Sequence, residues 1–219
     1  MYADIYPGDY WAFSNIPYTY LDENDEEQES TYSGTMRAAD FDYLYKCSDA
    51  LISAHHVGVV PDAPMFDAPM NDTDTTEGGY VGSKMRTVYL RRAEAIFKAC
   101  FGENHVLKHR EYLVNAVRDG MALGGAWCDS LVELMDERMV YGSLICDSAI
   151  GNMGMNKDSM SMSQLNLFRY RPDMIGNRHY VWLRNVGSAK HFSRIQIAGF
   201  SSMQVASTFH GVRPYALIY

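Results

Sequence analysis

The chain has 219 residues, of which 47% are hydrophobic and 21% charged, and its formal net charge is −8. This composition is typical of a globular protein that buries a core of its own. The negative charge argues against nucleic-acid binding, which needs a basic patch or stripe. No apolar run reaches the roughly 18 residues of a membrane-spanning helix, so we expect no membrane insertion.

The N-terminus and the cysteines indicate where the protein is made. The first residues contain neither the basic nor the apolar segment of a secretory signal, so we expect synthesis and folding in a bacterial cytoplasm. Cys47, Cys100, Cys128 and Cys146 lie too far apart in the sequence for a zinc-type pair. We interpret them as reduced structural thiols and expect no metal and no cofactor.

An acidic run interrupts the strand patterns at the start of the chain. Residues 9–13 predict a first strand, which residues 16–20 continue or pair with. Residues 21–30 carry six acidic side chains, and their mutual repulsion predicts a solvated loop. A calcium loop is the alternative, but the run lacks the glycine on which an EF-hand loop turns.

Two further strand patterns follow, at residues 35–45 and 55–60, and Pro61 ends the second. The adjacent His55 and His56 would point to opposite faces of a strand, which favours packing over a shared metal. Residues 61–77 are rich in Pro, Asp, Asn and Thr and predict a loop.

The clearest helix is predicted for residues 83–100, where apolar residues recur at spacings of three and four. We predict Ser83 as the N-cap and Gly102 as the C-terminal stop. The basic side chains on the opposite face suggest simple solvation of an amphipathic helix.

The middle of the chain leaves more than one interpretation open. Residues 105–117 fit a short strand leading into a short helix that ends at Asp119-Gly120, and residues 130–141 fit either a helix or strands. Residues 151–161 predict a loop, and residues 163–170 a short helix that ends before Pro172. Together the elements predict one α+β domain over residues 1–219.

Motifs for common enzyme classes are missing from the sequence. We find no nucleotide-binding glycine motif, no hydrolase nucleophile elbow and no zinc-protease helix motif. His105 and His109 have the spacing at which two histidines on a helix could share a metal, but their neighbours give little support for such a site. We therefore expect no catalytic residues.

The C-terminal stretch, residues 180–219, has a different character. Two apolar, strand-like runs bracket a middle in which basic, aromatic, amide and aliphatic residues follow each other without a clean period. Irregular segments on a rigid scaffold commonly carry binding function.

Spaced motifs in this stretch are Trp182-Leu-Arg-Asn-Val186, Ser188-Ala189, Phe192, Gly199, Ala206-Ser207 and Gly211-Val-Arg-Pro214. They resemble the variable region of diversity-generating retroelement variable proteins. Upstream segments are similar to phage and prophage structural proteins that carry the same end; these segments are 36–43, 55–62, 78–85, 109–112 and 132–135.

The resemblance implies a C-type lectin-like fold, in which short antiparallel strands accompany two or three helices and the N- and C-terminal strands pair. It places a variable region at about residues 182–214, whose codons an error-prone reverse transcriptase diversifies at adenines. The implied product is a non-enzymatic display protein, virion-associated, with a protein or other host-surface ligand and phage tail components as partners. Because the chain lacks the Glu-Pro-Asn and Trp-Asn-Asp motifs of calcium lectins, calcium-dependent sugar binding is not expected.

The resemblance and the residue chemistry divide the stretch into two sets. The framework set contains large anchors, turning glycines, a proline and two arginines that we expect to be ion-paired inside the frame: Trp182, Arg184, Phe192, Gly199, Gly211, Arg213 and Pro214. The variable, ligand-binding set is His191, Arg194, Gln196, Ile197, Ala198, Phe200, Ser202, Met203, Gln204, Val205, Thr208, Phe209 and His210.

Ile197 has two open interpretations. In a plain half-buried strand it would face inward together with Ile195, whereas the resemblance exposes it. We expect Phe200, Met203 and Phe209 to form one exposed apolar patch, which usually marks an interaction site. Aromatic residues and arginine dominate binding energies, so Phe200, Phe209 and Arg194 are the expected hot spots.

Two other functions stay open. The terminal patch could contact another subunit, either in a structural virion protein or in a homo-oligomer. An oxidase of the formylglycine-generating type has the same fold, but it uses a cysteine pair late in the chain, and here no cysteine follows Cys146.

Overall fold

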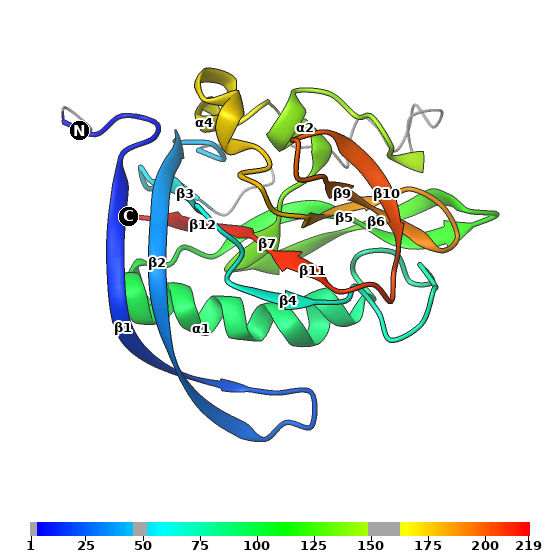
Figure 1. Cartoon of the computed structure of the whole chain (residues 1–219), viewed down its shortest axis with the longest axis horizontal. Helices are drawn as coiled ribbons and strands as arrows, with labels where there is room; N and C mark the ends of the chain where they lie inside the picture. Colours follow the sequence, from blue (N-terminus) through cyan, green and yellow to red (C-terminus); the bar gives the residue numbers. More distant parts are fainter. Residues whose placement is uncertain (1–3, 46–51, 149–162) are drawn as a thin grey trace.

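This computed structural model describes residues 4–45, 52–148 and 163–219. Within them the chain forms two five-stranded sheets and a separate two-stranded hairpin (Figure 1). Together with the helices they make a mixed α+β structure, as predicted. The loop predicted at residues 151–161 and the thiol of Cys47 lie outside the described residues.

The first sheet has the order β1-β2-β3-β12-β7. Its strands are β1 (Tyr10–Leu21), β2 (Glu27–Phe41), β3 (Val57–Pro61), β12 (Pro214–Ile218) and β7 (Val132–Leu134). The predicted pairing of N- and C-terminal strands is wrong, because β12 pairs with β3 and β7 while β1 pairs with β2. Every residue of β12 is buried, which requires neighbours on both sides, whereas the mostly exposed β1 lies at the sheet edge.

The acidic run forms the tip of a long hairpin between β1 and β2. Asp22 closes the turn, because its carboxylate accepts hydrogen bonds from the backbone N–H groups of Asn24 (2.8 Å) and Glu26 (3.1 Å). The loop prediction is confirmed for residues 22–26 only, since Glu27 already begins β2. The two strand segments predicted at the start of the chain are one strand with an irregularity between Phe13 and Ile16.

The second sheet has the order β10-β9-β8-β11-β4. Its strands are β10 (Ser201–Val205), β9 (His191–Ile195), β8 (Val181–Val186), β11 (His210–Val212) and β4 (Phe66–Ala68). β11 runs parallel to β8, and the other pairs are antiparallel. The loop predicted for residues 61–77 therefore contains a short strand, β4, which becomes ordered by pairing with β11.

The predicted long helix is confirmed. A π-helical turn (Met85–Tyr89) leads into α1 (Leu90–Phe101), which ends at Gly102 with φ of 95°. The hydroxyl of Ser83 accepts a hydrogen bond from the N–H of Arg86 (3.3 Å), as expected of a capping residue. The buried face of α1 carries Leu90, Ala93, Ile96 and Phe97.

The basic face of this helix is not simply solvated, so that prediction is wrong. Arg86 donates to the buried Glu133 (2.9 Å), and Arg92 donates to the hydroxyl of Tyr18 (2.9 Å). Both partners come from strands that the periodicity of the helix could not reveal.

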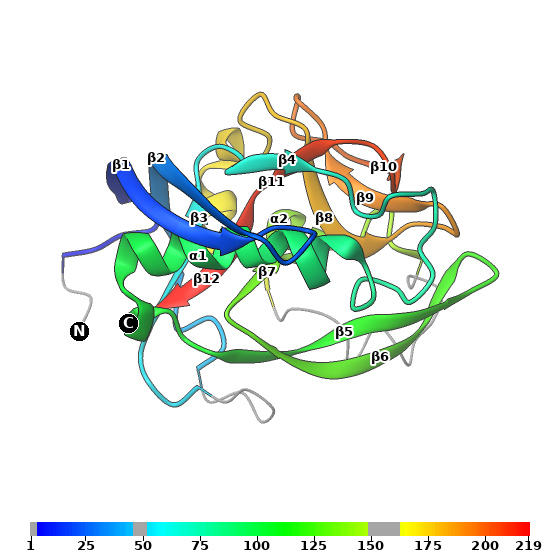
Figure 2. The same cartoon turned by 90° about the horizontal axis from the view of Figure 1, so that it is seen from below.

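Residues 105–117 do not form a strand followed by a helix. After a 3₁₀ turn (Glu103–His105), β5 (His109–Arg118) and β6 (Met121–Ser130) form a hairpin that extends along one side of the molecule (Figure 2). Asp119 and Gly120 have φ of 52° and 76°, so they make a two-residue hairpin turn instead of a helix end. His105 and His109 do not share a helix.

Three short helical segments complete the described chain. Residues 130–141 contain both alternatives, β7 followed by α2 (Glu137–Tyr141). The predicted helix before Pro172 is α4 (Asn166–Tyr170), followed by a 3₁₀ turn (Pro172–Met174).

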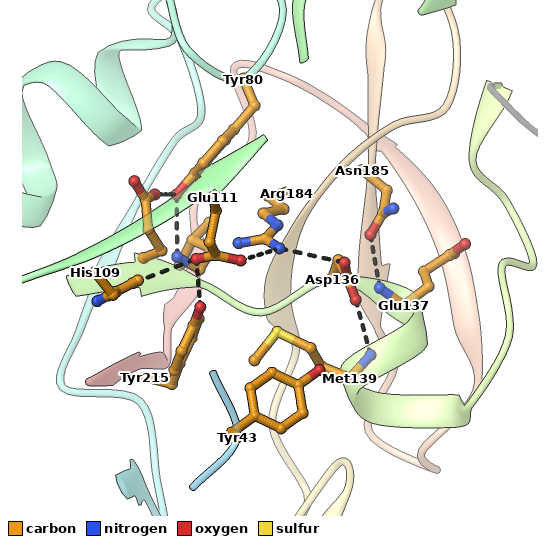
Figure 3. Close-up of polar contacts among 12 residues, drawn as sticks. Tyr43, Tyr80, His109, Glu111, Asp136, Glu137, Met139, Arg184, Asn185 and Tyr215 are labelled. Carbon is orange, nitrogen blue, oxygen red and sulfur yellow. Dashed lines mark hydrogen bonds and ion pairs between the residues drawn. The ribbon is translucent and has the colours of Figure 1, made fainter. Parts of the chain in front are cut away.

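A buried ionic network around Arg184 joins the two sheets and the hairpin (Figure 3). Its Nη2 lies 2.6 Å from Glu111 on β5 and 3.3 Å from Asp136 before α2. Tyr215 on β12 donates a hydrogen bond to Glu111, and Nε2 of His109 lies 3.3 Å from the same carboxylate. Burial alone would raise the pKa of Glu111, but Arg184 and His109 hold that pKa well below its usual range. Arg184 is therefore ion-paired inside the frame, as expected.

Arg213 is buried, and none of the acidic side chains that the structure describes forms an ion pair with it, which corrects our expectation. It donates hydrogen bonds to the backbone carbonyls of Pro61 (2.6 Å), Met174 (3.0 Å) and Ile175 (2.8 Å). Burial lowers its pKa to about 10. The guanidinium thus provides hydrogen-bond donors to backbone carbonyls at the end of the turn after α4. Arginine suits this position because its N–H groups point in several directions.

Arg184→Met should lower the free energy of unfolding by about 3–5 kcal/mol, because it leaves Glu111 and Asp136 buried without their cation. Urea unfolding followed by circular dichroism would measure the loss. Arg171→Met is the matched control: Arg171 forms an exposed ion pair with Asp173 (2.8 Å), and its loss should cost at most about 1 kcal/mol. Equal losses in the two variants would contradict a structural role for the network.

Candidate ligand-binding surface

Strands β9 and β10 form a ribbon at the edge of the second sheet (Figure 1). The predicted variable residues lie on this ribbon, on its closing turn and on the loop to β11, except His210, which begins β11. In the register, His191 is opposite Val205 and Arg194 is opposite Ser202. Among the described strands of this sheet β10 is the outermost, so none of them pairs with the ribbon on that side.

Most of the variable set is accessible. Phe209 and Phe200 are 68% and 67% exposed, and Ile197 and Met203 are 47% and 45% exposed. Ala198 is also exposed, and the partly exposed members are His191, Arg194, Gln196, Ser202, Gln204, Val205 and Thr208.

The exposure of Ile197 follows from where β9 ends. Ile195 is the last residue of the strand and is fully buried, so the inward alternation stops there. Ile197 lies in the turn that follows. The interpretation that exposes it is confirmed, and the one that packs it inward is wrong.

Backbone hydrogen bonds close this turn. The N–H of Gln196 donates to the carbonyl of Phe200 (2.8 Å), and the N–H of Gly199 donates to the carbonyl of Gln196 (2.8 Å). Gly199 has φ of 86°, a backbone conformation that favours glycine. The turn therefore depends on backbone geometry and on Gly199, not on the side chains of the residues between.

The two faces of the ribbon carry different members of the variable set. Residues opposite each other in an antiparallel pair share a face, and consecutive residues alternate. Arg194 donates to the hydroxyl of Ser202 (3.1 Å) on one face. Met203 projects from the other face, where a Cβ added at Gly187 would lie 2.5 Å from its sulfur.

The three side chains of the predicted apolar patch, Phe200, Met203 and Phe209, are all exposed. Met203 lies on the face of the ribbon opposite to Arg194, and Phe209 is the last residue of the loop before β11. Phe200 is at the end of the ribbon, in the closing turn. That the three form one patch stays a prediction.

His210 is buried within a stack of rings, which corrects its assignment to the outward-facing set. Its ring centroid lies 4.9 Å from that of Trp182 and 5.3 Å from that of Tyr180. Nη1 of Arg194 lies 2.7 Å from Nε2 of His210, and the guanidinium lies 4.6 Å from the Tyr180 ring centre. Burial, and then the charge of Arg194, lower the pKa of His210 to about 4. The imidazole is thus neutral and accepts the hydrogen bond.

The remaining framework residues lie inside the structure. Trp182 is fully buried, and its indole N–H donates to the carbonyl of Ala68 on β4 (2.9 Å). Phe192 is fully buried, and Pro214 begins β12. At Gly211 an added Cβ would lie 2.3 Å from the ring of Pro64, so a larger residue does not fit.

Sequence reasoning missed a carboxylate that holds the ribbon in place. The buried Glu137 accepts hydrogen bonds from the hydroxyl of Ser201 (2.5 Å) and from the backbone N–H groups of Ile145 (2.6 Å) and Asp147 (3.2 Å). Its own N–H donates to Asn185 on β8 (2.7 Å; Figure 3). The start of β10 is thereby fixed to α2 and β8.

An exposed aspartate holds the loop before β11. The hydroxyl and the backbone N–H of Ser207 both donate to Asp74, at 2.6 and 3.2 Å. Phe209 therefore follows a loop that is held by these hydrogen bonds to Asp74. Asp74 lies 133 residues from Ser207 and Glu137 lies 64 residues from Ser201, so no local sequence pattern could identify these contacts.

Comparison of the chain with protein-family models, with curated proteins and with solved structures finds no match. In the described part of the chain, no helix is both long and apolar enough to cross a membrane. The described histidine, cysteine, aspartate and glutamate side chains form no group of three that could hold a metal ion.

Arg194→Met should raise the pKa of His210 from about 4 toward its ordinary 6.5, because it removes a positive charge beside the ring. Asp67→Asn should lower this pKa further, because the negative charge of Asp67 favours the protonated imidazole. Histidine resonances in an NMR pH titration would measure both shifts. Lys190→Met, which removes an exposed cation, should leave the titration unchanged.

The same pKa predicts how stability depends on pH. Because the folded pKa of His210 lies below the unfolded value, the unfolded state binds the proton more readily. The contribution of His210 to the free energy of unfolding is therefore complete above pH 6.5. About 3 kcal/mol of it should be lost as the pH falls from 6.5 to 4. His210→Gln should flatten this dependence.

Proposed function

We propose that this chain is a non-enzymatic display protein that presents the β9–β10 ribbon and the loop to β11 to a protein or other ligand on a host surface. The observation that carries the proposal is the contrast between a buried polar frame and large exposed side chains on one connected segment. Exposed aromatic side chains of this size commonly mark interaction sites.

The construction of the ribbon fits a surface whose residues can vary. Its turn is closed by backbone hydrogen bonds, and the start of β10, next to this turn, is held by the hydrogen bond from Ser201 to Glu137. Side chains such as Ile197 and Phe200 contribute little to that support because they are exposed. This agrees with the resemblance of the segment to retroelement-diversified proteins, and it supports the finer proposal of a C-type lectin-like, phage-associated receptor-binding protein.

The cysteines support a non-enzymatic function. Burial raises the pKa of Cys100 to about 12 and also raises the pKa values of Cys128 and Cys146. A reactive cysteine needs a lowered pKa, since the thiolate is the nucleophile. The described thiols therefore lack the environment that the oxidase alternative requires.

A contact between copies of the chain is the second candidate. The observation that favours it is the outer position of β10, because an unpaired strand edge can pair with another chain. Light scattering separates the two functions. If the wild-type chain assembles and a Phe200→Ser/Phe209→Ser variant does not, the ribbon is a subunit contact.

The variant Phe200→Ser/Phe209→Ser should melt within a few degrees of the wild-type chain, because both rings are mostly exposed. The same variant should lose at least tenfold in binding to cells of the natural host. Phe192→Ser is the matched control: the buried ring should not be replaceable without unfolding. Unfolding of the exposed double variant would place those rings in the core and overturn the proposed surface.

The genome gives a separate test of diversification. We expect a reverse-transcriptase gene nearby and a near-copy of the coding segment for residues 182–214 that differs at adenines. If this arrangement is missing, retroelement diversification is ruled out for this chain, while ligand binding by the ribbon stays testable through the variants above.

A further inference from the structure

A cleft of about 320 Å³ lies beside Phe209. Its sides come from the tip of the β1–β2 hairpin, from β4 and from the π-helical turn and first residues of α1. Figure 2 shows this hairpin lying alongside α1. The volume is in the range of small-ligand pockets and is large enough for one long side chain.

Aromatic rings line the cleft on several sides. They belong to Tyr20, Phe66, Tyr89 and Phe209. Phe209 is 68% exposed, so its ring presents most of its surface to whatever enters. A ring face attracts a cation through its quadrupole, and such contacts contribute about 0.5–2 kcal/mol.

The charges on the lining are mainly negative. Asp22, Glu23 and Asp67 line the cleft together with one basic residue, Arg92. The guanidinium of Arg92 is held at the wall, 5.1 Å from the ring centre of Tyr20 and 4.8 Å from that of Phe66. Three carboxylates against one guanidinium disfavour an anionic occupant.

The three carboxylates differ in the partners that they already have within the chain. Asp22 closes the hairpin turn, and Glu23 pairs with Lys84 at 2.6 Å. Asp67 is exposed, and no described side chain pairs with it. It lies opposite Gly211 on β11, two residues from Phe209, and both Asp67 and Phe209 line the cleft.

We infer that this cleft binds a lysine or arginine side chain of a protein ligand, with the aliphatic part along the rings and the charged end at Asp67. The inference rests on the proposed function and names the chemistry of one contact within it. A cationic side chain can donate a charge-assisted hydrogen bond to Asp67 and can also stack on the ring of Phe209. An apolar side chain can contact only the rings and leaves Asp67 without a partner. The net charge of −8 favours the approach of a basic partner.

Short peptides test the inference on the full chain. The probes are acetyl-Gly-Gly-X-Gly-Gly-amide with X as arginine, lysine, norleucine or glutamate, titrated into ¹⁵N-labelled protein and followed by NMR. We expect the arginine and lysine peptides to shift the amide resonances of Asp67 and Phe209 and to bind at least fivefold more tightly than the norleucine peptide. The glutamate peptide should not bind.

Two variants and a control locate the contact. Asp67→Asn should bring the arginine peptide to the affinity of the norleucine peptide, and Phe209→Ser should weaken both. Tyr170→Ser should change neither, because Tyr170 is an exposed ring on α4, outside the cleft. Equal binding of arginine and norleucine to the wild-type chain, shifts that map elsewhere, or no effect of Asp67→Asn would each overturn the inference.

Peptide selectivity and host-cell binding test the cleft and the proposed function separately. Host binding that depends on Phe200 and Phe209, without basic-peptide selectivity, would leave the display function standing and remove the cleft from it. Selective peptide binding without host-cell binding would support the cleft and overturn the proposed host ligand.

Discussion

The rest of the structure depends on the buried pairing of Arg184 with Glu111 and Asp136. A buried ion pair is not in itself strongly stabilising, because desolvation offsets most of the attraction. Its effect is on arrangement: the guanidinium on β8 fixes the positions of β5 and of the start of α2, and Tyr215 brings in β12. Any shift between these elements would leave a charge buried without a partner, so their relative placement is narrowly determined.

The precision of this frame explains how the ribbon can be both exposed and well positioned. Asn185 follows Arg184 on β8 and accepts a hydrogen bond from Glu137, which in turn holds Ser201 at the start of β10. A continuous chain of polar contacts therefore connects the buried network to the exposed strand. The outer residues of the ribbon are free of this structural task, and their side chains are available for contact with a partner.

Sequence reasoning predicted the elements whose evidence is local and failed where the evidence is distant. α1 followed from apolar spacing and from Gly102, and the burial of Arg184 followed from its place in an apolar strand. The β5–β6 hairpin was missed because Asp119-Gly120 can end a helix or turn a hairpin, and only the pairing of the two strands decides. Glu111 could not be assigned at all, since its partner Arg184 lies 73 residues away in the sequence.

The mixed origin of the cleft beside Phe209 has an evolutionary consequence. Phe209 belongs to the segment proposed to vary, whereas the hairpin tip, β4 and α1 lie outside it. The hairpin tip, β4 and α1 would thus keep their sequence, while residue 209 would change from one variant to the next. Lineages that differ at residue 209 would keep a common preference for basic groups and diverge in what they accept beside them. Diversification would then explore a family of related ligands, with a fixed acidic contact limiting how far any variant can depart from its parent.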